Sequence, residues 1–194
     1  MAKERVAVVV DGGGRGHALV DKYAPDVNRL IAIPGNDAMR MNTDKPVELF
    51  PDLKTTNVDK IVEICQREIE RGSKLLVDVA QDNAVAAGVV DALLKIGVPV
   101  IGPTRAAGQI EWSKIWEREF GQAEGLLQPS FKVCRTEEEG ILYIKSQSNQ
   151  AWFVKADGLT EGKGALPAEN NDEAIERIKE LKRRFPEAAQ TYLI

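Results

Sequence analysis

The residues that point most directly to chemistry lie in one short stretch, residues 151–165 (AWFVKADGLTEGKGA). Gly158, Gly162 and Gly164 allow the backbone to approach a ligand closely and to turn its N–H groups toward it. Lys155 and Lys163 add two cations, and N–H donors clustered with lysines suit a triphosphate. The stretch is not a Walker A motif, because three residues separate Gly158 from Gly162 and no Ser or Thr follows Lys163. It therefore predicts a phosphate-binding loop of another kind.

A second glycine cluster, residues 12–16 (GGGRG), follows the apolar run at residues 6–10. It lacks the dinucleotide fingerprint G-x-G-x-x-G, because His17 or Leu19 occupies the third glycine position. Two interpretations remain: a strand-to-helix turn that only packs, or a phosphate site at a helix N-terminus. The presence of Arg15 favours the phosphate site.

Several single side chains allow both a functional and a structural interpretation. His17, the one histidine of the sequence, could transfer protons, but a role in orienting a ligand or in structure is favoured because no Ser or Cys partner is evident. Asp78 lies inside an expected strand and reads as structural, whereas Asp82 lies beyond its end and could bind a ligand amine or hydroxyl. Lys114, taken alone, would be an ordinary solvated lysine.

Alternating strands and helices position these residues in the first half of the chain. The expected strands are residues 6–10, 29–33, 74–79 and 98–101. The expected helices are residues 17–23, 58–69, with Asn57 as N-cap, and 84–95, and residues 34–56 read as loop with short extended pieces. This alternation predicts a parallel sheet whose ligands bind at the carboxyl ends of its strands. Four segments then converge on a pocket: residues 11–15, 34–37, 80–82 and 102–103.

The pattern changes after Pro103, so we expect one domain over residues 1–103 and a second over 104–194. The second is expected to contain helices at 105–110, 113–122, 137–146 and 172–184, strands at 130–134 and leading into Lys155, and the start of a strand at Thr191. A strand needs partners on both sides unless it lies at an edge, so we expect the chain to stop inside a domain.

Composition excludes several classes of protein. The 194 residues are 43% hydrophobic and 29% charged, as in ordinary globular proteins, and the net charge of −4 with no basic run argues against nucleic-acid binding. Cys65 and Cys134 are isolated, so no disulfide framework or metal knuckle is indicated. The absence of a membrane-length apolar run and of a signal-peptide pattern favours a cytoplasmic protein that does not bind membranes. The sequence does not define the oligomeric state.

The motifs occur in an order that resembles the glycinamide ribonucleotide synthetase (phosphoribosylamine–glycine ligase) family of the ATP-grasp superfamily. They are residues 13–19 (GGRGHAL), 34–36 (PGN), 87–91 (AGVVD), 101–103 (IGP), Ser113-Lys114, 154–159 (VKADGL) and 162–164 (GKG). The resemblance implies a Rossmann-like, parallel-sheet pre-ATP-grasp domain followed by a small α+β ATP-grasp lid subdomain.

The resemblance also implies a reaction. ATP phosphorylates the carboxylate of free glycine, and 5-phosphoribosylamine attacks the acyl phosphate to give glycinamide ribonucleotide, ADP and phosphate. By similarity the nucleotide site comprises Lys114, Lys155, Gly158, Gly162, Lys163 and Gly164, with residues 158–164 as a mobile loop over the phosphates. By similarity the residues that hold phosphoribosylamine are Gly13, Gly14, Arg15, Asn36 and Asp82. The Mg²⁺ ligands would lie beyond Ile194, so we expect no metal ligand within the chain and no catalysis by these residues alone.

The chain departs from the family pattern on the phosphoribosylamine side. Asp11 replaces a glycine, Gly16 replaces a glutamate, residues 80–82 (AQD) replace Gly-Pro-Glu, and residues 84–85 (AV) replace a proline-leucine pair. Two alternatives therefore stay open: an ATP-grasp carboxylate–amine ligase with another substrate, and a non-catalytic binding module that retains the fold.

Overall fold

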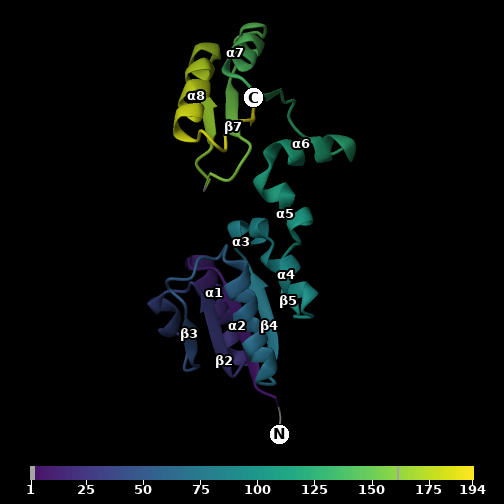
Figure 1. The fold of residues 1–194 in the computed structure, drawn as a ribbon. Coiled ribbons are helices and arrows are strands. Elements are labelled where there is room, and N and C mark those ends of the chain that lie inside the picture. The colour runs from purple at the N-terminus through teal and green to yellow at the C-terminus, as the bar shows by residue number, and fades with distance from the viewer. Residues whose placement is uncertain (1–2, 161) are drawn as a thin grey trace. The chain divides into compact units, whose positions relative to one another are not determined.

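The computed structural model describes residues 3–160 and 162–194, and it divides into two compact units between Gly108 and Gln109 (Figure 1). The sequence placed the domain boundary after Pro103, whereas the units divide inside helix α5 (Arg105–Trp112). Each unit has its own sheet and core.

A five-stranded parallel sheet in the order β3-β2-β1-β4-β5 forms the centre of the first unit. Its strands are β1 (Arg5–Val10), β2 (Arg29–Ile33), β3 (Val47–Leu49), β4 (Lys74–Val79) and β5 (Val100–Ile101). Its helices are α1 (Gly14–Tyr23), α2 (Val58–Glu70), α3 (Asp82–Ala87) and α4 (Val89–Lys95), with 3-10 turns η1 (Ala24–Asp26) and η2 (Asp37–Arg40). The predicted fold class is confirmed for this unit.

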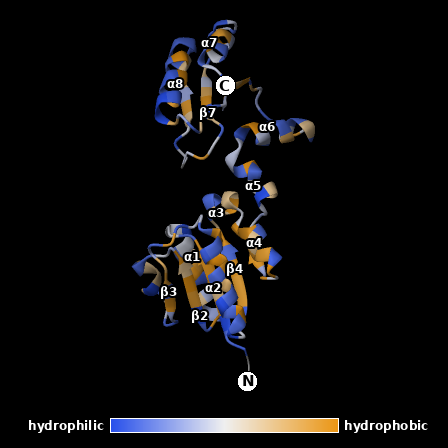
Figure 2. Cartoon of the chain, in the orientation of Figure 1, coloured by the Kyte–Doolittle hydropathy of each residue, from blue (hydrophilic) through white to orange (hydrophobic). Residues whose placement is uncertain are grey.

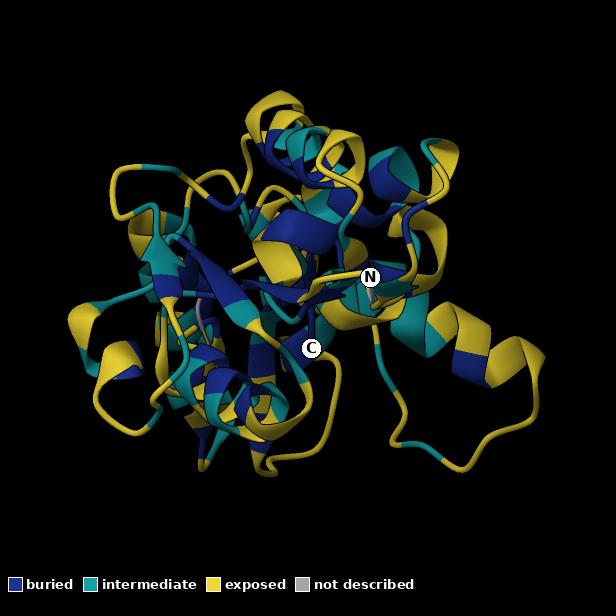
Figure 3. Ribbon diagram, turned by 90° about the horizontal axis from the view of Figure 1, so that it is seen from below, coloured by how far each residue is buried: buried dark blue, intermediate teal, exposed yellow. Residues whose placement is uncertain are grey.

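Both faces of this sheet are buried, as expected for strands rich in valine and isoleucine. On one face Ala7 and Val9 of β1 pack in a single cluster with Val20 of α1. The alternate residues of β1 point to the opposite face. The chain runs from β1 through α1 to β2, and from β4 through α3 and α4 to β5, in opposite directions along the sheet. Because such crossovers are right-handed, the two sets of helices cover opposite faces. The central strands β1, β2 and β4 are accordingly largely buried, and hydrophobic and buried strands are visible in Figure 2 and in Figure 3.

The predicted helix over residues 84–95 is wrong in one respect, because it is two helices. Gly88 separates α3 from α4 and adopts a left-handed conformation with φ of 89°. A glycine reaches this conformation without steric cost and commonly ends a helix there. The Asn57 side chain accepts a hydrogen bond from Lys60 N at the start of α2, as predicted, whereas α1 begins at Gly14, three residues before the predicted start at His17.

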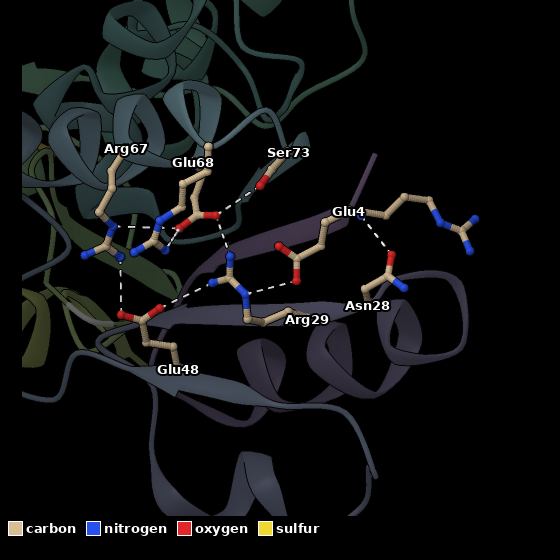
Figure 4. Close-up of polar contacts among 9 residues, drawn as sticks. Glu4, Asn28, Arg29, Glu48, Arg67, Glu68 and Ser73 are labelled. Atoms are coloured by element: carbon tan, nitrogen blue, oxygen red, sulfur yellow. Dashed lines mark hydrogen bonds and ion pairs between the residues drawn. The ribbon is translucent and has the colours of Figure 1, made fainter. Parts of the chain in front are cut away.

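One group of charged residues connects α2 to the sheet of the first unit (Figure 4). Glu68 of α2 is fully buried and pairs with Arg29 of β2, with Arg71 at 2.9 Å and with Ser73 Oγ at 3.2 Å. Arg29 also lies 3.4 Å from Glu48 of β3. A buried carboxylate with several donors is a structural feature whose loss is expected to be costly.

The second unit is a four-stranded antiparallel sheet in the order β6-β9-β7-β8. Its strands are β6 (Val133–Cys134), β7 (Trp152–Ala156), β8 (Ala165–Ala168) and β9 (Tyr192–Leu193), and its helices are α6 (Lys114–Ala123), α7 (Glu137–Lys145) and α8 (Asn171–Arg184). The expected strand at Thr191 forms as β9 and finds both its neighbours, β6 and β7, within the chain. Strand β8 had no sequence prediction.

Alternation along β7 gives the second sheet one covered face and one open face. Trp152, Val154 and Ala156 are buried in a cluster to which α7 and α8 contribute Ile144 and Ile178. The intervening residues of β7, Phe153 and Lys155, lie on the other face, and Phe153 is exposed. Among the described residues, no helix is long and apolar enough to cross a bilayer.

Candidate functional site

The first unit has an open cavity of about 690 Å³ at the carboxyl ends of β1, β2 and β4. Strands β1 and β4 are neighbours whose connections leave in opposite directions, which is where open α/β sheets bind ligands. The lining residues are Asp11, Gly12, Gly13, Gly14, Arg15, Pro34, Lys54, Thr55, Thr56, Gln81 and Asn83. Three of the four predicted segments meet here, whereas Gly102 and Pro103 are not among the lining residues.

Asp11 organises the wall of this cavity. Its buried carboxylate accepts a hydrogen bond from Gly13 N at 2.6 Å through one oxygen and from Arg15 Nε at 2.9 Å through the other. The guanidinium of Arg15 is half exposed, and its Nη1 lies 3.9 Å from Asp82. Asp11 therefore fixes the turn between β1 and α1 and orients Arg15 at the cavity rim.

Gly16 of α1 packs closely against Asp11. A Cβ on Gly16 would lie 2.5 Å from the backbone oxygen of Asp11 and 3.0 Å from its Cβ. Because backbone atoms do not move aside easily, any side chain at position 16 would displace Asp11. The glycine at 16 thus allows the start of α1 to lie against the backbone of residue 11.

We expect Gly16→Ala to lower the free energy of unfolding of the first unit by about 2 kcal/mol, as overpacking typically does. Gly14→Ala, two residues earlier in α1, is the matched control, since a Cβ there has no neighbour within 4 Å. The control should stay within about 1 kcal/mol of the parent protein. Urea unfolding followed by amide hydrogen exchange in β1 measures both, and equal stability of the two variants would contradict the packing argument.

Asn36 and Asp82, both predicted to hold the amine substrate, support the cavity rather than line it. The Asn36 amide donates to Gly12 O at 2.9 Å, and its oxygen caps η2 by accepting from Ala38 N at 3.0 Å. Asp82, half exposed, reaches the cavity through its contact with Arg15. Sequence reasoning missed the cavity residues 54–56, which include the buried Thr55, because this segment has no periodic pattern.

His17 and Asp78 lie away from the cavity lining. His17 Nε2 lies 3.4 Å from Asn42 Nδ2 and 3.7 Å from Asp21. Asp78 is buried in β4 and accepts a 2.6 Å hydrogen bond from the Tyr23 hydroxyl. Burial, with the adjacent Asp78, raises the pKa of Tyr23 to about 12. These contacts favour structural roles, as expected for Asp78.

In the second unit, Lys155 lies on the open face of the sheet near the end of β7, opposite Ala165 of β8 and Leu193 of β9. Its Nζ lies 5.5 Å from the centre of the Phe153 ring. It helps to line a cavity of about 570 Å³ with polar and apolar walls, including Arg118, Phe131 and Tyr143. A cation beside exposed apolar surface suits a ligand that carries both phosphates and an aromatic base.

Lys114 begins α6, and Ser113 caps this helix by accepting from Trp116 N at 3.1 Å. Burial lowers the pKa of Lys114, and the charge of Lys155 acts in the same direction, while Asp157 opposes both. Lys114 N lies 3.4 Å from Asp157 O, two residues beyond Lys155, so the segments that carry the two lysines are in contact although 41 positions separate them in the sequence (155 − 114). The structure brings together these two predicted nucleotide ligands.

The predicted phosphate loop connects β7 to β8. Ala156 N donates to Gly164 O at 2.8 Å, which closes the hairpin, and Lys163 N donates to Thr160 O at 3.0 Å. Gly162 has φ of 77°, and a side chain on Gly164 would meet the side chain of the buried Thr160. A Cβ on Gly158 would lie 3.1 Å from Ala188 Cβ. Lys163 is exposed, and Glu161 lies outside the described residues.

Metal ligands do not gather in the part of the chain that the structure describes. Among these residues, no three His, Cys, Asp or Glu side chains lie close enough together to hold a metal ion. We therefore assign no magnesium ligand to them.

Sequence comparisons match both units to one family. The family described as "Phosphoribosylglycinamide synthetase, N domain" matches residues 5–111, and "Phosphoribosylglycinamide synthetase, ATP-grasp (A) domain" matches residues 112–194. A phosphoribosylamine–glycine ligase from Streptococcus pneumoniae is 32% identical over 176 residues, which cover 90% of this chain and 40% of that protein. The chain thus spans about 40% of the length of such relatives.

Solved structures share the fold. A phosphoribosylamine–glycine ligase from Thermotoga maritima superposes with a TM-score of 0.66 at 23% identity, over 97% of this chain and 42% of that one. An ADP complex of N5-carboxyaminoimidazole ribonucleotide synthetase gives a TM-score of 0.67 at 13% identity, over 100% of this chain and 47% of that one.

A parallel-sheet unit with a strand-end cavity, followed by a small antiparallel unit, defines the class of ATP-grasp proteins. Since the first family match alone covers more than half of its residues, the chain belongs to the phosphoribosylglycinamide synthetase family.

Proposed function

We propose that this chain forms the amine-binding and nucleotide-covering parts of an ATP-dependent ligase that joins free glycine to 5-phosphoribosylamine. The products are glycinamide ribonucleotide, ADP and phosphate, with glycyl phosphate as intermediate. The proposal places the reaction in the cytoplasm, with small molecules as its partners. Its support is the family membership and the two sites described above.

The observation that carries the proposal is the contact between the start of α6 and the end of β7, which brings the segments that carry Lys114 and Lys155 together where the glycine loop begins. Phosphoryl transfer depends mainly on positioning and on neutralising the charge of the transferred group. Two cations from different elements can contact different phosphate oxygens, and loop N–H groups can add further donors. When bound, Mg²⁺ would supply additional charge neutralisation, and we assign none of its ligands to the described residues.

The first cavity is proposed to hold the amine substrate. The free N–H groups of Arg15 and the Lys54 ammonium offer positive charge for its phosphate, and the N-terminus of α1 adds backbone donors. Asp82 is the available carboxylate near the rim for an amine or a ribose hydroxyl.

The direct test supplies the full gene product with ATP, free glycine and 5-phosphoribosylamine and measures ADP release. Release that requires all three supports the proposal. Release with another amine or acid, but not with these substrates, would overturn the substrate assignment, and no release with any amine or acid would favour a non-catalytic module.

One observation favours the second candidate, a ligase for another amine. Arg15 is already paired with the buried Asp11 and lies close to Asp82, so two carboxylates compete with a phosphate for its guanidinium. A site with this balance of charge could also accept a cationic amine without phosphate. Inhibition of ADP release by inorganic phosphate separates the two candidates. Phosphate should compete with the amine substrate only if the cavity holds the phosphate group of that amine.

Lys155→Ala is expected to weaken ATP binding about tenfold, because it removes a charge-assisted contact to phosphate. Lys179→Ala is the control, since Lys179 is exposed on α8 and pairs with Glu176 at 2.7 Å. Isothermal titration calorimetry of the full gene product measures both affinities. Unchanged ATP affinity in Lys155→Ala would remove that lysine from the nucleotide site.

A further inference from the structure

Asp157 connects three segments of the second unit that are distant in sequence. Its Oδ1 accepts from Ser113 Oγ at 3.0 Å and from Ile115 N at 2.9 Å. Its own N–H lies 3.1 Å from Ala188 O and 3.3 Å from Thr191 O. Asp157 is not among the proposed nucleotide contacts.

These bonds surround Lys114. One carboxylate oxygen is bonded to the residue before it and to the residue after it, and Lys114 N lies 3.4 Å from Asp157 O. The first turn of a helix has unsatisfied N–H groups and frays unless they are bonded. Asp157 therefore holds the start of α6 from outside the helix.

The same residue is joined to Lys155 by the chain, because only Ala156 separates them at the end of β7. The backbone bonds of Asp157 to residues 188 and 191 anchor that end to the segment leading into β9. The side chain of Asp157, together with these backbone bonds, thus contributes to the spacing between the two lysines. Its negative charge also raises the pKa of Lys114 against the opposing effects of burial, the largest cause, and of Lys155.

We propose that Asp157 is a positioning residue that sets Lys114 beside Lys155 so that both can contact one nucleotide. The inference rests on the proposed function, since it assumes that the lysine pair binds phosphates. Asp157 itself need not touch the nucleotide.

Two substitutions separate its geometric and electrostatic contributions. Asp157→Ala removes both hydrogen bonds to the start of α6, and we expect ADP affinity of the full gene product to fall about tenfold. Asp157→Asn retains an oxygen acceptor without the charge, and we expect affinity within about threefold of the parent protein. Thr136→Ala is the matched control, because Thr136 caps α7 in the same unit by accepting from Glu139 N at 3.2 Å. It should lower the melting temperature and leave ADP affinity unchanged.

A measurement without nucleotide makes the test independent of the proposed function. Reductive ¹³C-methylation gives each lysine an NMR signal, and Lys114→Arg identifies that of Lys114. In Asp157→Ala the signal should move and broaden at constant pH, whereas in Asp157→Asn it should remain sharp but titrate at lower pH than in the parent protein.

The outcomes have distinct meanings. An unchanged Lys114 signal in Asp157→Ala would overturn the positioning inference, whether or not ADP binds. A parent protein that shows no ADP binding, with the expected signal changes in the variants, would overturn the nucleotide proposal and leave Asp157 as the residue that orders Lys114. A fall in ADP affinity equal in Thr136→Ala and Asp157→Ala would show a general stability effect and also overturn the inference.

Discussion

Glu68→Gln is expected to lower the free energy of unfolding of the first unit by about 3 kcal/mol. Glu68 is fully buried, and its carboxylate bonds to Arg29 and Arg71 and accepts from Ser73 Oγ (Figure 4). A glutamine has nearly the same shape but no charge. The side chain of Arg29, which is only 17% exposed, would therefore lose its buried counter-ion. The remaining partners of Arg29, Glu4 and Glu48, are more exposed and lie 3.5 Å and 3.4 Å away.

The effect should depend on pH. Burial raises the pKa of Glu68, but the hydrogen bond and charge of Arg29, the charge of Arg71 and the Ser73 hydroxyl overcome it, and the pKa lies below the ordinary value of 4.5. A carboxyl whose pKa is lower in the folded state contributes stability above its unfolded pKa and loses it as pH falls through the folded pKa. The stability difference between parent and Glu68→Gln should therefore be full at neutral pH and shrink as pH falls below 4.5.

Glu63→Gln provides the control on the same helix. Glu63 is 67% exposed and pairs with Lys60 at 2.7 Å, so its loss should change stability by less than about 1 kcal/mol. Amide hydrogen exchange in β1 and β2 reports on the first unit alone. Equal, small effects of the two substitutions would show that the buried network contributes no more than a surface ion pair.

The fold was predictable where one physical signal dominates. The largely apolar runs at residues 29–33 and 74–79 define strands with the observed bounds, since a parallel sheet buries both faces and leaves few alternatives. The secondary structure was harder to predict where two sequence signals oppose each other. Gly88 lies within an apolar helical pattern, and the sequence alone does not show that its φ is positive and divides the helix. Strand β8 is only four residues long and contains Pro167. Proline is found in strands mainly at the edge of a sheet, and β8 is such an edge strand, but its place in the sheet cannot be read from the sequence.

The site was predictable only as far as its motifs are local. Residues 12–16 and the neighbourhood of Lys155 can be recognised because glycine and cation lie within a few residues of each other. The contribution of residues 54–56 to the first cavity comes from a long connection, and connection paths leave no periodic signal. The bond between Asp157 and Ser113 joins residues 44 positions apart, so the motif around Lys155 identifies the aspartate but not its partner.

Gly140→Ala is expected to lower the free energy of unfolding of the second unit by about 3 kcal/mol, at the upper end of the usual cost of overpacking. Gly140 is buried in the middle of α7, and a Cβ there would collide with the Tyr192 hydroxyl and lie 2.9 Å from Ile178 Cδ1. Tyr192 is fully buried, and its hydroxyl donates to Thr136 O at 2.8 Å. The ring therefore cannot move away without breaking that bond and shifting β9.

A double-mutant cycle with Tyr192→Phe distinguishes this collision from a general preference for glycine. Tyr192→Phe alone should cost about 1 kcal/mol, the value of one hydrogen bond. The double variant lacks the oxygen with which the new Cβ collides. Its loss of unfolding free energy should therefore be smaller than the sum of the two single losses by about 1 kcal/mol or more. Relief remains partial, because the new Cβ still lies 3.0 Å from Tyr192 Cζ. Urea unfolding followed by amide hydrogen exchange in β7 and β9 measures the cycle, and additive losses would place the cost elsewhere than at Tyr192. Because Tyr192 lies in β9, which pairs with Lys155 and Ala156 of β7, the same cycle tests whether α7, on the covered face of the sheet, fixes the position of β9 beside β7.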